Sequence, residues 1–351
     1  MVEFAGPRSP RRLFAGSLNV CIIFLLFGAS GLLAQQGLTS ISTEVKRVFD
    51  QAKNAVVRIQ AEDEHGRLAG TGFFIDPDGT IFTAYEVGGE SWDIIVEFGS
   101  SRYPAERLVA DARSGIAILK VSGGTPWLCT GDSDELKLAS PVVTIGYPMD
   151  LSVTPSFGMI GGFDLKYLNQ YFSTTLIRAN IAAQRGEAGS PVLNLKGEVV
   201  GILIFPIDNR TACYALPIKA AEKVRSDYVR FGEVRPGWVG VSVVEAEEPV
   251  HDSTAIIQSF AEGSPAVESG LQQGDVLLRI GGVPVHSPPD VVNASFFLTA
   301  EQDVPITVFR DGKEVTVTVT AADHPDVIVQ QKFPLFAPAN LENALRTKDR
   351  E

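Results

Sequence analysis

Serine and glutamate side chains are the groups in this sequence that could take part in nucleophilic chemistry. Ser190 lies in the stretch QRGEAGSPVLN at 184–194, and Ser114 lies further toward the N-terminus. A serine hydroxyl needs a base within about 3 Å to take its proton. Glu86 could act as that base, but the ordinary carboxyl pKa of about 4 suits serine activation poorly. Histidine is the more usual base, and the four histidines are scattered: His65, His251, His286 and His324.

The sequence predicts no metal site and no cofactor. The histidines are far apart, and the cysteines show none of the close spacing that metal sites use. The glycines lie in turns between strands, whereas a phosphate-binding loop leads from a strand into a helix. Beyond Cys21, the cysteines Cys129 and Cys213 form an even pair. A disulfide between them and two free thiols are equally good interpretations.

Composition limits the classes of partner. The chain has 351 residues, 45% of them hydrophobic, and a formal net charge of −12. This length predicts two or three folded domains. The negative charge, without a long basic run, argues against nucleic acid or an anionic membrane surface as the main partner.

The first 34 residues have the order of an export signal. Arg8, Arg11 and Arg12 precede the apolar run LNVCIIFLLFGASGLLA. This order is typical of a secretory signal peptide. An uncleaved membrane anchor remains the alternative, because the run is about 18 residues long and close to the minimum for a bilayer span. Both alternatives place the body of the protein outside the cytoplasm, in the periplasm or cell envelope.

Two regions with different patterns follow the signal. Apolar residues at helical spacing predict a helix near 41–52, and short β runs separated by turns then continue to about Pro206. A second helix is expected over 218–231, and the RPG at 235–237 indicates a boundary. The second region combines strands with a helix over 289–299 and a hairpin turning at Asp311-Gly312. Residues 324–351 are expected to form a poorly ordered tail.

Several sequence motifs, in their order along the chain, resemble those of the HtrA (Do/Deg-type) class of trypsin-like periplasmic proteases with a C-terminal PDZ domain. They include GTGFFIDPDGTIFTAYEV, DARSGIAILKV, VVTIGYPMDLSVTPSFGMIGG, GSPVLNLKGEVVGI and GSPAVESGLQQGDVLLRIGG, and the resemblance extends over about 42–322. It implies a mainly β protein: a chymotrypsin-like double β-barrel domain over 35–232, then a PDZ domain of strands and two short helices over 233–323.

The three catalytic positions of the family are substituted in this chain. By the resemblance, Glu86 stands where the histidine belongs, Gly115 where the aspartate belongs, and Ala188 where the serine belongs. Gly186 and Ala188 form what is left of the oxyanion loop, and Arg185 replaces a proline usual there. Because the loss of one triad member alone costs orders of magnitude in rate, the sequence predicts a non-catalytic homologue, a pseudoprotease of the serine endopeptidase class.

The PDZ region keeps the features of peptide recognition. In PDZ domains a peptide adds a strand to the sheet, and loop N–H groups hold its terminal carboxylate. The resemblance places that loop at Trp238, Val239, Gly240 and Val241. Val292 and Phe296, one turn apart on the predicted helix, are expected to line the peptide pocket. The alternative is that both are core residues.

Two functions remain open at this stage. The first is a non-catalytic exported protein that binds unfolded or C-terminal peptide segments through its PDZ domain as a chaperone, adaptor or regulator in protein quality control. The second is a serine endopeptidase that acts on unfolded proteins with displaced catalytic residues. The resemblance also implies a homotrimer, or a mixed oligomer with an active homologue.

Overall fold

The computed structural model describes residues 41–168, 170–207 and 211–323. The chain divides into two units, with the boundary between Arg47 and Val48. The predicted signal or anchor over 1–34 and the predicted tail over 324–351 lie outside the described residues. Residues 41–52 are helical, as their spacing predicts. In the described ranges, no helix has the length and apolar character needed to cross a membrane.

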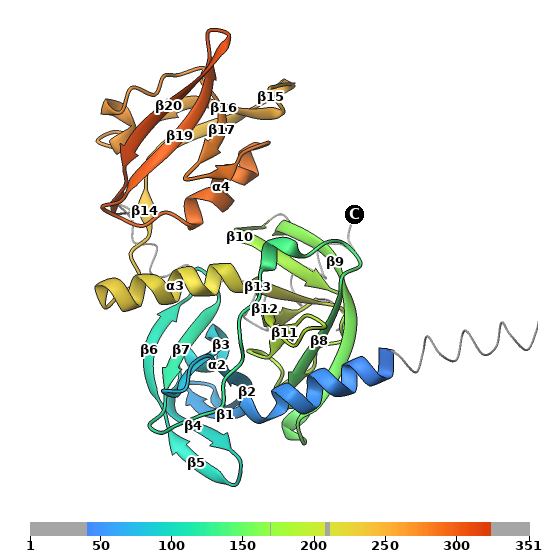
Figure 1. The fold of residues 1–351 in the computed structure, drawn as a ribbon. Helices are drawn as coiled ribbons and strands as arrows, with labels where there is room; N and C mark the ends of the chain where they lie inside the picture. Colours follow the sequence, from blue (N-terminus) through green and yellow to red (C-terminus); the bar gives the residue numbers. More distant parts are fainter. Residues whose placement is uncertain (1–40, 169, 208–210, 324–351) are drawn as a thin grey trace, which may run out of the picture. The chain divides into compact units, whose positions relative to one another are not determined.

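The first half of the β region forms one antiparallel sheet of seven strands in the order β5-β4-β1-β2-β3-β7-β6 (Figure 1). Its strands are β1 (Val56–Asp63), β2 (Gly66–Phe74), β3 (Thr80–Ala84), β4 (Trp92–Phe98), β5 (Ser101–Pro104), β6 (Glu106–Asp111) and β7 (Ile116–Lys120). β3 lies between β2 and β7 and is buried along its whole length. This explains its apolar and threonine-rich sequence, TIFTA, because a central strand packs on both faces.

The second half forms a closed barrel in the order β10-β13-β12-β11-β8-β9. Its strands are β8 (Pro141–Gly146), β9 (Thr154–Tyr167), β10 (Gln170–Ala179), β11 (Pro191–Leu193), β12 (Val199–Pro206) and β13 (Cys213–Pro217). Buried aliphatic side chains such as Val142, Ile177 and Leu203 fill the core. Closure pairs every strand on both sides, so the barrel has no free edge.

Short helices connect the strands, and the longer helix α3 follows the barrel. The short elements are η1 (Lys53–Ala55), α2 (Tyr85–Gly88), η2 (Ser133–Glu135) and η3 (Pro148–Asp150). α3 (Ile218–Phe231) has the predicted bounds. It ends at Gly232, whose φ of +79° is the left-handed conformation that glycine adopts at helix ends.

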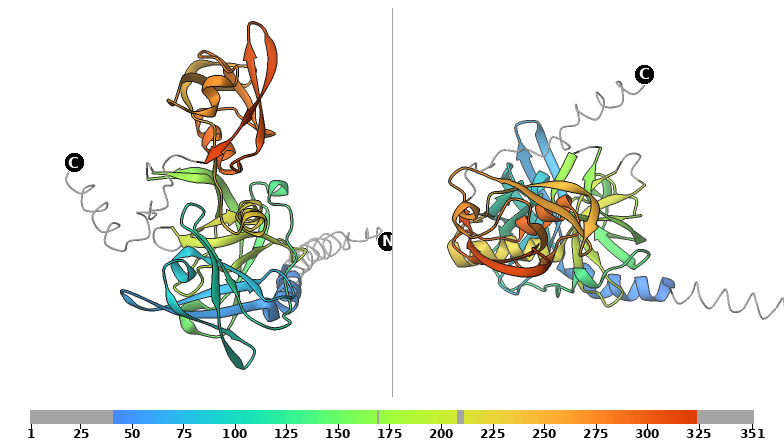
Figure 2. Two further views of the ribbon diagram at one scale, coloured as in Figure 1. Left: turned by 90° about the vertical axis from the view of Figure 1, so that its left-hand side faces the viewer. Right: turned by 90° about the horizontal axis from the view of Figure 1, so that it is seen from above.

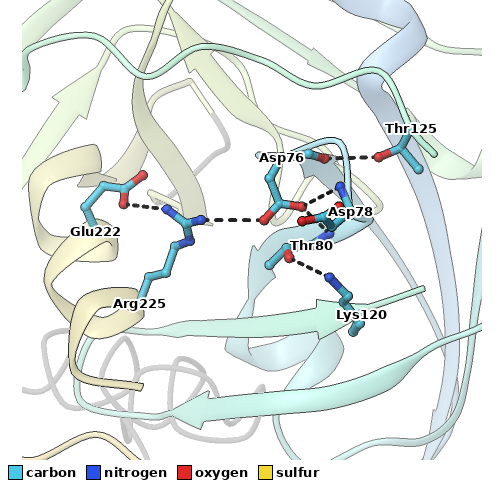
Figure 3. Close-up of polar contacts among 7 residues, drawn as sticks. All are labelled: Asp76, Asp78, Thr80, Lys120, Thr125, Glu222 and Arg225. Carbon is cyan, nitrogen blue, oxygen red and sulfur yellow. Dashed lines mark hydrogen bonds and ion pairs between the residues drawn. The ribbon is translucent and has the colours of Figure 1, made fainter. Parts of the chain in front are cut away.

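The turn between β2 and β3 is tied to α3 by Asp76 (Figure 3). Oδ1 of Asp76 accepts hydrogen bonds from the backbone N–H groups of Asp78 and Thr80, at 3.1 and 3.0 Å. Oδ2 lies 3.5 Å from the Arg225 guanidinium. Burial alone would raise the pKa of Asp76, but the hydrogen bonds from Thr80 and Asp78 and the charge of Lys120 lower it below its usual value.

The second region is a separate sheet with strand order β15-β16-β17-β19-β20, with β18 paired to β17. Its elements are β14 (Gly237–Trp238), β15 (Val241–Val250), β16 (Ser253–Phe260), η5 (Pro265–Glu268), β17 (Val276–Ile280), β18 (Val283–Pro284), α4 (Pro288–Phe296), β19 (Asp303–Arg310), β20 (Lys313–Thr320) and β21 (Ala322–Asp323). The hairpin of β19 and β20, red in Figures 1 and 2, turns at Asp311 and Gly312, whose φ angles are +50° and +80°. Two successive positive φ angles fit the turn type predicted for Asp-Gly.

Candidate active site and peptide-binding edge

The three positions that the resemblance assigns to catalysis lie in segments far apart in the sequence. Glu86 is the second residue of α2, directly after β3. The N–H of the preceding Tyr85 donates to the carbonyl of Gly115, N···O 2.8 Å, and the carbonyl of Ala188 accepts from the Thr71 N–H at 2.9 Å. The structure therefore places Gly115 beside the residue before Glu86. It places Ala188 against β2, which pairs with β3, the strand that leads to Glu86.

The loop from Gly186 to Ser190, called here the serine loop, is held by its backbone. The Gly189 N–H donates to the Leu203 carbonyl at 2.7 Å, and Thr71 Oγ1 donates to the Gly186 carbonyl at 2.7 Å. Gly186 and Gly189 have φ angles of +94° and +88°, where a side chain is strained. Within the described ranges, no hydrogen bond uses the N–H of Gly186 or Ala188. Free N–H groups at this position are what an oxyanion site requires.

Glu86 has an unusual carboxyl group for an exposed residue. Its side chain has accessible surface, yet the surrounding protein desolvates the carboxyl and raises its pKa from 4.5 to about 7. Glu86 is therefore accessible to water, although protein atoms surround its carboxyl closely enough to desolvate it. The ordinary pKa assumed from the sequence was therefore wrong, and a carboxyl with a pKa near 7 suits general-base chemistry.

Glu187 is buried within the serine loop. Burial raises the pKa of its carboxyl, and a 2.7 Å hydrogen bond from the Gln184 N–H to Oε2 partly opposes that rise. The side chain is only 3% exposed. Glu187 therefore mainly stabilises the conformation of the loop through this hydrogen bond.

Neither candidate serine reaches the surface. Ser190 is fully buried, and its Oγ has no hydrogen-bond partner among the described residues. Ser114 is 2% exposed, and its Oγ donates to the Asp111 carbonyl at 3.2 Å. Ser114 is therefore a turn hydroxyl, whereas Ser190 is an unpaired hydroxyl inside the loop. An unpaired buried hydroxyl is uncommon and calls for an explanation.

Cys129 and Cys213 are both free thiols. Cys129 is exposed and Cys213 is buried, so the structure does not pair them. Burial, and to a smaller degree the charge of Glu187, raises the pKa of Cys213 to about 12. In the described parts of the chain, no group of three or more histidine, cysteine or acidic residues is arranged to hold a metal ion.

The carboxylate loop predicted in the second region precedes an edge strand. Gly240 has a φ of +82°, and its carbonyl accepts hydrogen bonds from the Ala261 N–H at 2.9 Å and from Ser264 Oγ at 3.3 Å. The Val239 carbonyl accepts from the Ala266 N–H at 3.1 Å. β15, which follows directly, is the outermost strand of its sheet. An outermost strand presents the unpaired backbone groups that an added peptide strand needs.

The two residues predicted to line the peptide pocket differ in exposure. Val292 is 42% exposed on α4, whereas Phe296 is 2% exposed and packs edge-on against Phe297, with ring centroids 5.3 Å apart. Phe296 therefore offers no surface to a peptide in this conformation, and the Arg113 guanidinium lies 4.4 Å from its ring centroid. The alternative that both are core residues fits neither of them, because Val292 is exposed and Phe296 lies outside the hydrophobic core cluster of this region.

The sequence reasoning missed a cavity of about 830 Å³ beside the serine loop. Its wall includes Arg185 and Gly186 of the loop segment and Met149 and Asp150 of η3. Met149 and Asp150 both have positive φ angles, +48° and +63°. Strained backbone of this kind is concentrated at functional sites. The one signal in the sequence that could have pointed to this place is Arg185, which stands where the resemblance leads one to expect proline.

Comparison with known proteins defines the class. The family model described as a trypsin-like peptidase domain matches residues 70–202, and the PDZ domain model matches 237–321. A solved structure described as the HtrA-type protease AlgW with tripeptide has a TM-score of 0.67 at 21% identity, covering 80% of this chain and 97% of that one. A serine endoprotease structure from Yersinia pestis has a TM-score of 0.58, also at 21% identity, covering 80% of this chain and 98% of its own. These structural matches establish the shared fold.

Curated relatives give the same result from sequence. A probable periplasmic serine endoprotease, DegP-like, from Halomonas elongata is 32% identical over 76% of this chain and 59% of its own length. One from Chlamydia pneumoniae is 29% identical over 74% of this chain and 56% of its own. This chain thus spans well under two thirds of the relatives it matches. The chain therefore resembles HtrA/DegP-type proteins: it is mainly β, with a trypsin-like domain followed by a C-terminal PDZ domain. The periplasmic relatives confirm the predicted exported location.

The prediction that the chain is not an enzyme is wrong by these comparisons. The matching relatives are named serine endoproteases, and the domain that carries Glu86 and Ala188 matches the trypsin-like peptidase model. The reasoning failed because it took three substitutions inferred from a family resemblance as proof of inactivity. A resemblance of motifs says which residue types stand at the expected positions, and it says nothing of what other groups nearby can do.

Proposed function

We propose that this protein captures unfolded or C-terminal segments of exported proteins through its PDZ domain, in protein quality control of the periplasm or cell envelope. The edge strand β15 is the observation that carries the proposal, because a peptide can extend the sheet there. The inward hydrogen bonds of the Val239 and Gly240 carbonyls support a loop whose N–H groups hold a terminal carboxylate.

A C-terminal peptide library tests this capture. Each peptide is offered with a free carboxylate and as its C-terminal amide, and only the free acids are expected to bind. Substitution of Gly240 is a poor test, because an added Cβ would lie 2.7 Å from Ser264 Oγ at a φ of +82°. Val292→Asp should weaken binding, whereas Val267→Asp, at a residue 53% exposed on η5, is the matched control. Equal binding of acids and amides would overturn the proposal.

We further propose that the protein is a serine endopeptidase of unfolded proteins with displaced catalytic residues. In this proposal Glu86, Gly115 and Ala188 occupy the usual triad positions, and Glu86 itself is the base. Its pKa of about 7 supports that role. The N–H groups of Gly186 and Ala188, which have no acceptor among the described residues, suit the oxyanion, and the names of the relatives fit the activity.

Ser190 is the nucleophile that this proposal favours. It lies two residues after Ala188, and its Oγ has no hydrogen-bond partner among the described residues. Because the side chain is fully buried, the serine loop must rearrange when substrate binds. Such substrate-dependent completion of a catalytic site is a known way to restrict cleavage to the correct substrate.

Casein digestion and a fluorophosphonate probe test the endopeptidase. Digestion by the wild type should be lost in Glu86→Gln and in Ser190→Ala, and the probe should label the wild type but not Ser190→Ala. Ser133→Ala is the matched control, because Ser133 is also buried with an unpaired Oγ among the described residues. Casein left intact by the wild type would refute the activity, without affecting the peptide-capture result. Digestion that survives Ser190→Ala would refute the assigned nucleophile.

The homotrimer or mixed oligomer implied by the resemblance belongs to the same proposal. Light scattering of the purified chain at several concentrations should give three times the monomer mass. A monomer at all concentrations would contradict the homotrimer.

A further inference from the structure

The cavity beside the serine loop is large enough for part of a peptide. Its volume, about 830 Å³, lies within the range of roughly 300–1,000 Å³ typical of ligand pockets. Apolar side chains form part of its wall: Ala61, Leu68, Ala69, Ile95 and Met149. Gly186 borders the cavity directly, so a chain bound there would pass beside the serine loop.

Most charged side chains around this cavity already have a partner. The pairs are Arg67 Nε–Glu62 Oε1 at 3.4 Å, Arg58 Nη1–Asp150 Oδ1 at 3.1 Å, and Arg102 Nε–Glu97 Oε1 at 3.3 Å. Arg185 and Asp93 differ from these. Both are exposed cavity residues, and within 41–168, 170–207 and 211–323 neither side chain makes a hydrogen bond or an ion pair. One cation and one anion are therefore available to a ligand.

The strand register separates the backbone positions of these two residues along the direction of β1. The carbonyl of Gly186, next to Arg185, accepts a hydrogen bond from Thr71 Oγ1. Thr71 of β2 lies opposite Arg58 of β1 in the sheet. Asp93 follows Trp92, which pairs with Glu62 of β1. From Arg58 to Glu62 the strand advances by four residues, about 13 Å at roughly 3.3 Å per residue. An extended peptide bound parallel to β1 also advances by about 3.3 Å per residue, so it covers this separation in about four residues.

We propose that this cavity binds an extended peptide segment carrying an acidic residue, paired with Arg185, and a basic residue about four positions away, paired with Asp93. Arg185 and Asp93 then select the charge pattern of the chain beside the serine loop. The proposal rests on the proposed function only in taking an extended polypeptide as the occupant. It requires neither cleavage nor capture by the PDZ domain.

Binding of short peptides to the full chain tests the cavity apart from the PDZ domain. The probe is a fluorescent, C-terminally amidated peptide with one aspartate and one lysine four positions apart, followed by fluorescence anisotropy. Amidation removes the carboxylate that the PDZ loop would hold. Exchange of the aspartate for asparagine should weaken binding about three- to fivefold, the range of a partly exposed ion pair. Exchange of the lysine for glutamine should have a similar effect.

Protein variants then assign the two charges. Arg185→Gln should bind the aspartate and asparagine peptides equally, and Asp93→Asn should bind the lysine and glutamine peptides equally. Arg67→Gln is the control, because Arg67 is a cavity arginine already paired with Glu62, and it should keep both preferences. A preference unchanged in Arg185→Gln overturns the proposal, and so does the absence of binding up to about 1 mM peptide. Both results leave the capture of free C-terminal peptides unaffected.

Discussion

The ionisation of Glu86 should make the stability of this protein depend on pH in a predictable direction. The folded carboxyl has a pKa of about 7, against 4.5 as the ordinary value. Between these values the folded state binds more protons than the unfolded state, so stability is greatest below about pH 4.5 and falls as the pH rises to about 7. The full shift corresponds to about 3 kcal/mol, and solvent screening at an exposed residue reduces this to about 1–2 kcal/mol.

Urea unfolding at pH 5 and pH 7.5 measures this contribution. Wild type should lose about 1–2 kcal/mol more than Glu86→Gln over this interval, because glutamine does not ionise. Glu106→Gln is the control, since Glu106 is an exposed residue of β6, and it should keep the wild-type dependence. Equal losses in wild type and Glu86→Gln would refute the reasoning, and would also remove the support that the raised pKa gives to a base at this position.

Three further predictions concern other parts of the fold. Asp76→Ala should lower the free energy of unfolding by about 1–3 kcal/mol above pH 4, because it leaves two N–H groups and Arg225 without their acceptor. The effect should shrink at lower pH, as acid protonates the wild-type carboxylate. Equal unfolding curves for the two proteins would contradict the prediction. Gly189→Ala should lower the free energy of unfolding by about 1–3 kcal/mol, because φ is +88° and the new Cβ would lie 2.8 Å from the Ala84 nitrogen. An unchanged melting temperature would argue against this geometry of the serine loop. In native protein at pH 8, iodoacetamide should modify the exposed Cys129 and spare Cys213, whose buried thiol has a pKa of about 12. Mass spectrometry of the digested protein measures the modification of each cysteine. Rapid modification of Cys213 would contradict its burial.

Local features of the fold follow from the sequence. The helix over 218–231 and the hairpin at Asp311-Gly312 were predicted because their signals, helical spacing and a two-residue turn, lie within a few neighbouring residues. The order of the trypsin-like and PDZ domains came from motifs in series, and the matched models agree with it. The inference from the same motifs to inactivity failed, because motifs report the residues at known positions and not what other groups around them can do.

Tertiary structure decided the properties that depend on several distant segments at once. The carboxyl of Glu86 has a raised pKa because protein atoms around it remove water, and no pattern next to residue 86 contains that information. Ser190 and Phe296 are buried for the same kind of reason. Arg185 and Asp93 have no charged partner in the part of the chain that the structure describes, and this likewise depends on which neighbouring arginines and carboxylates pair with one another. Chain order gives residue types and local geometry, whereas desolvation and charge pairing arise only when remote segments pack together.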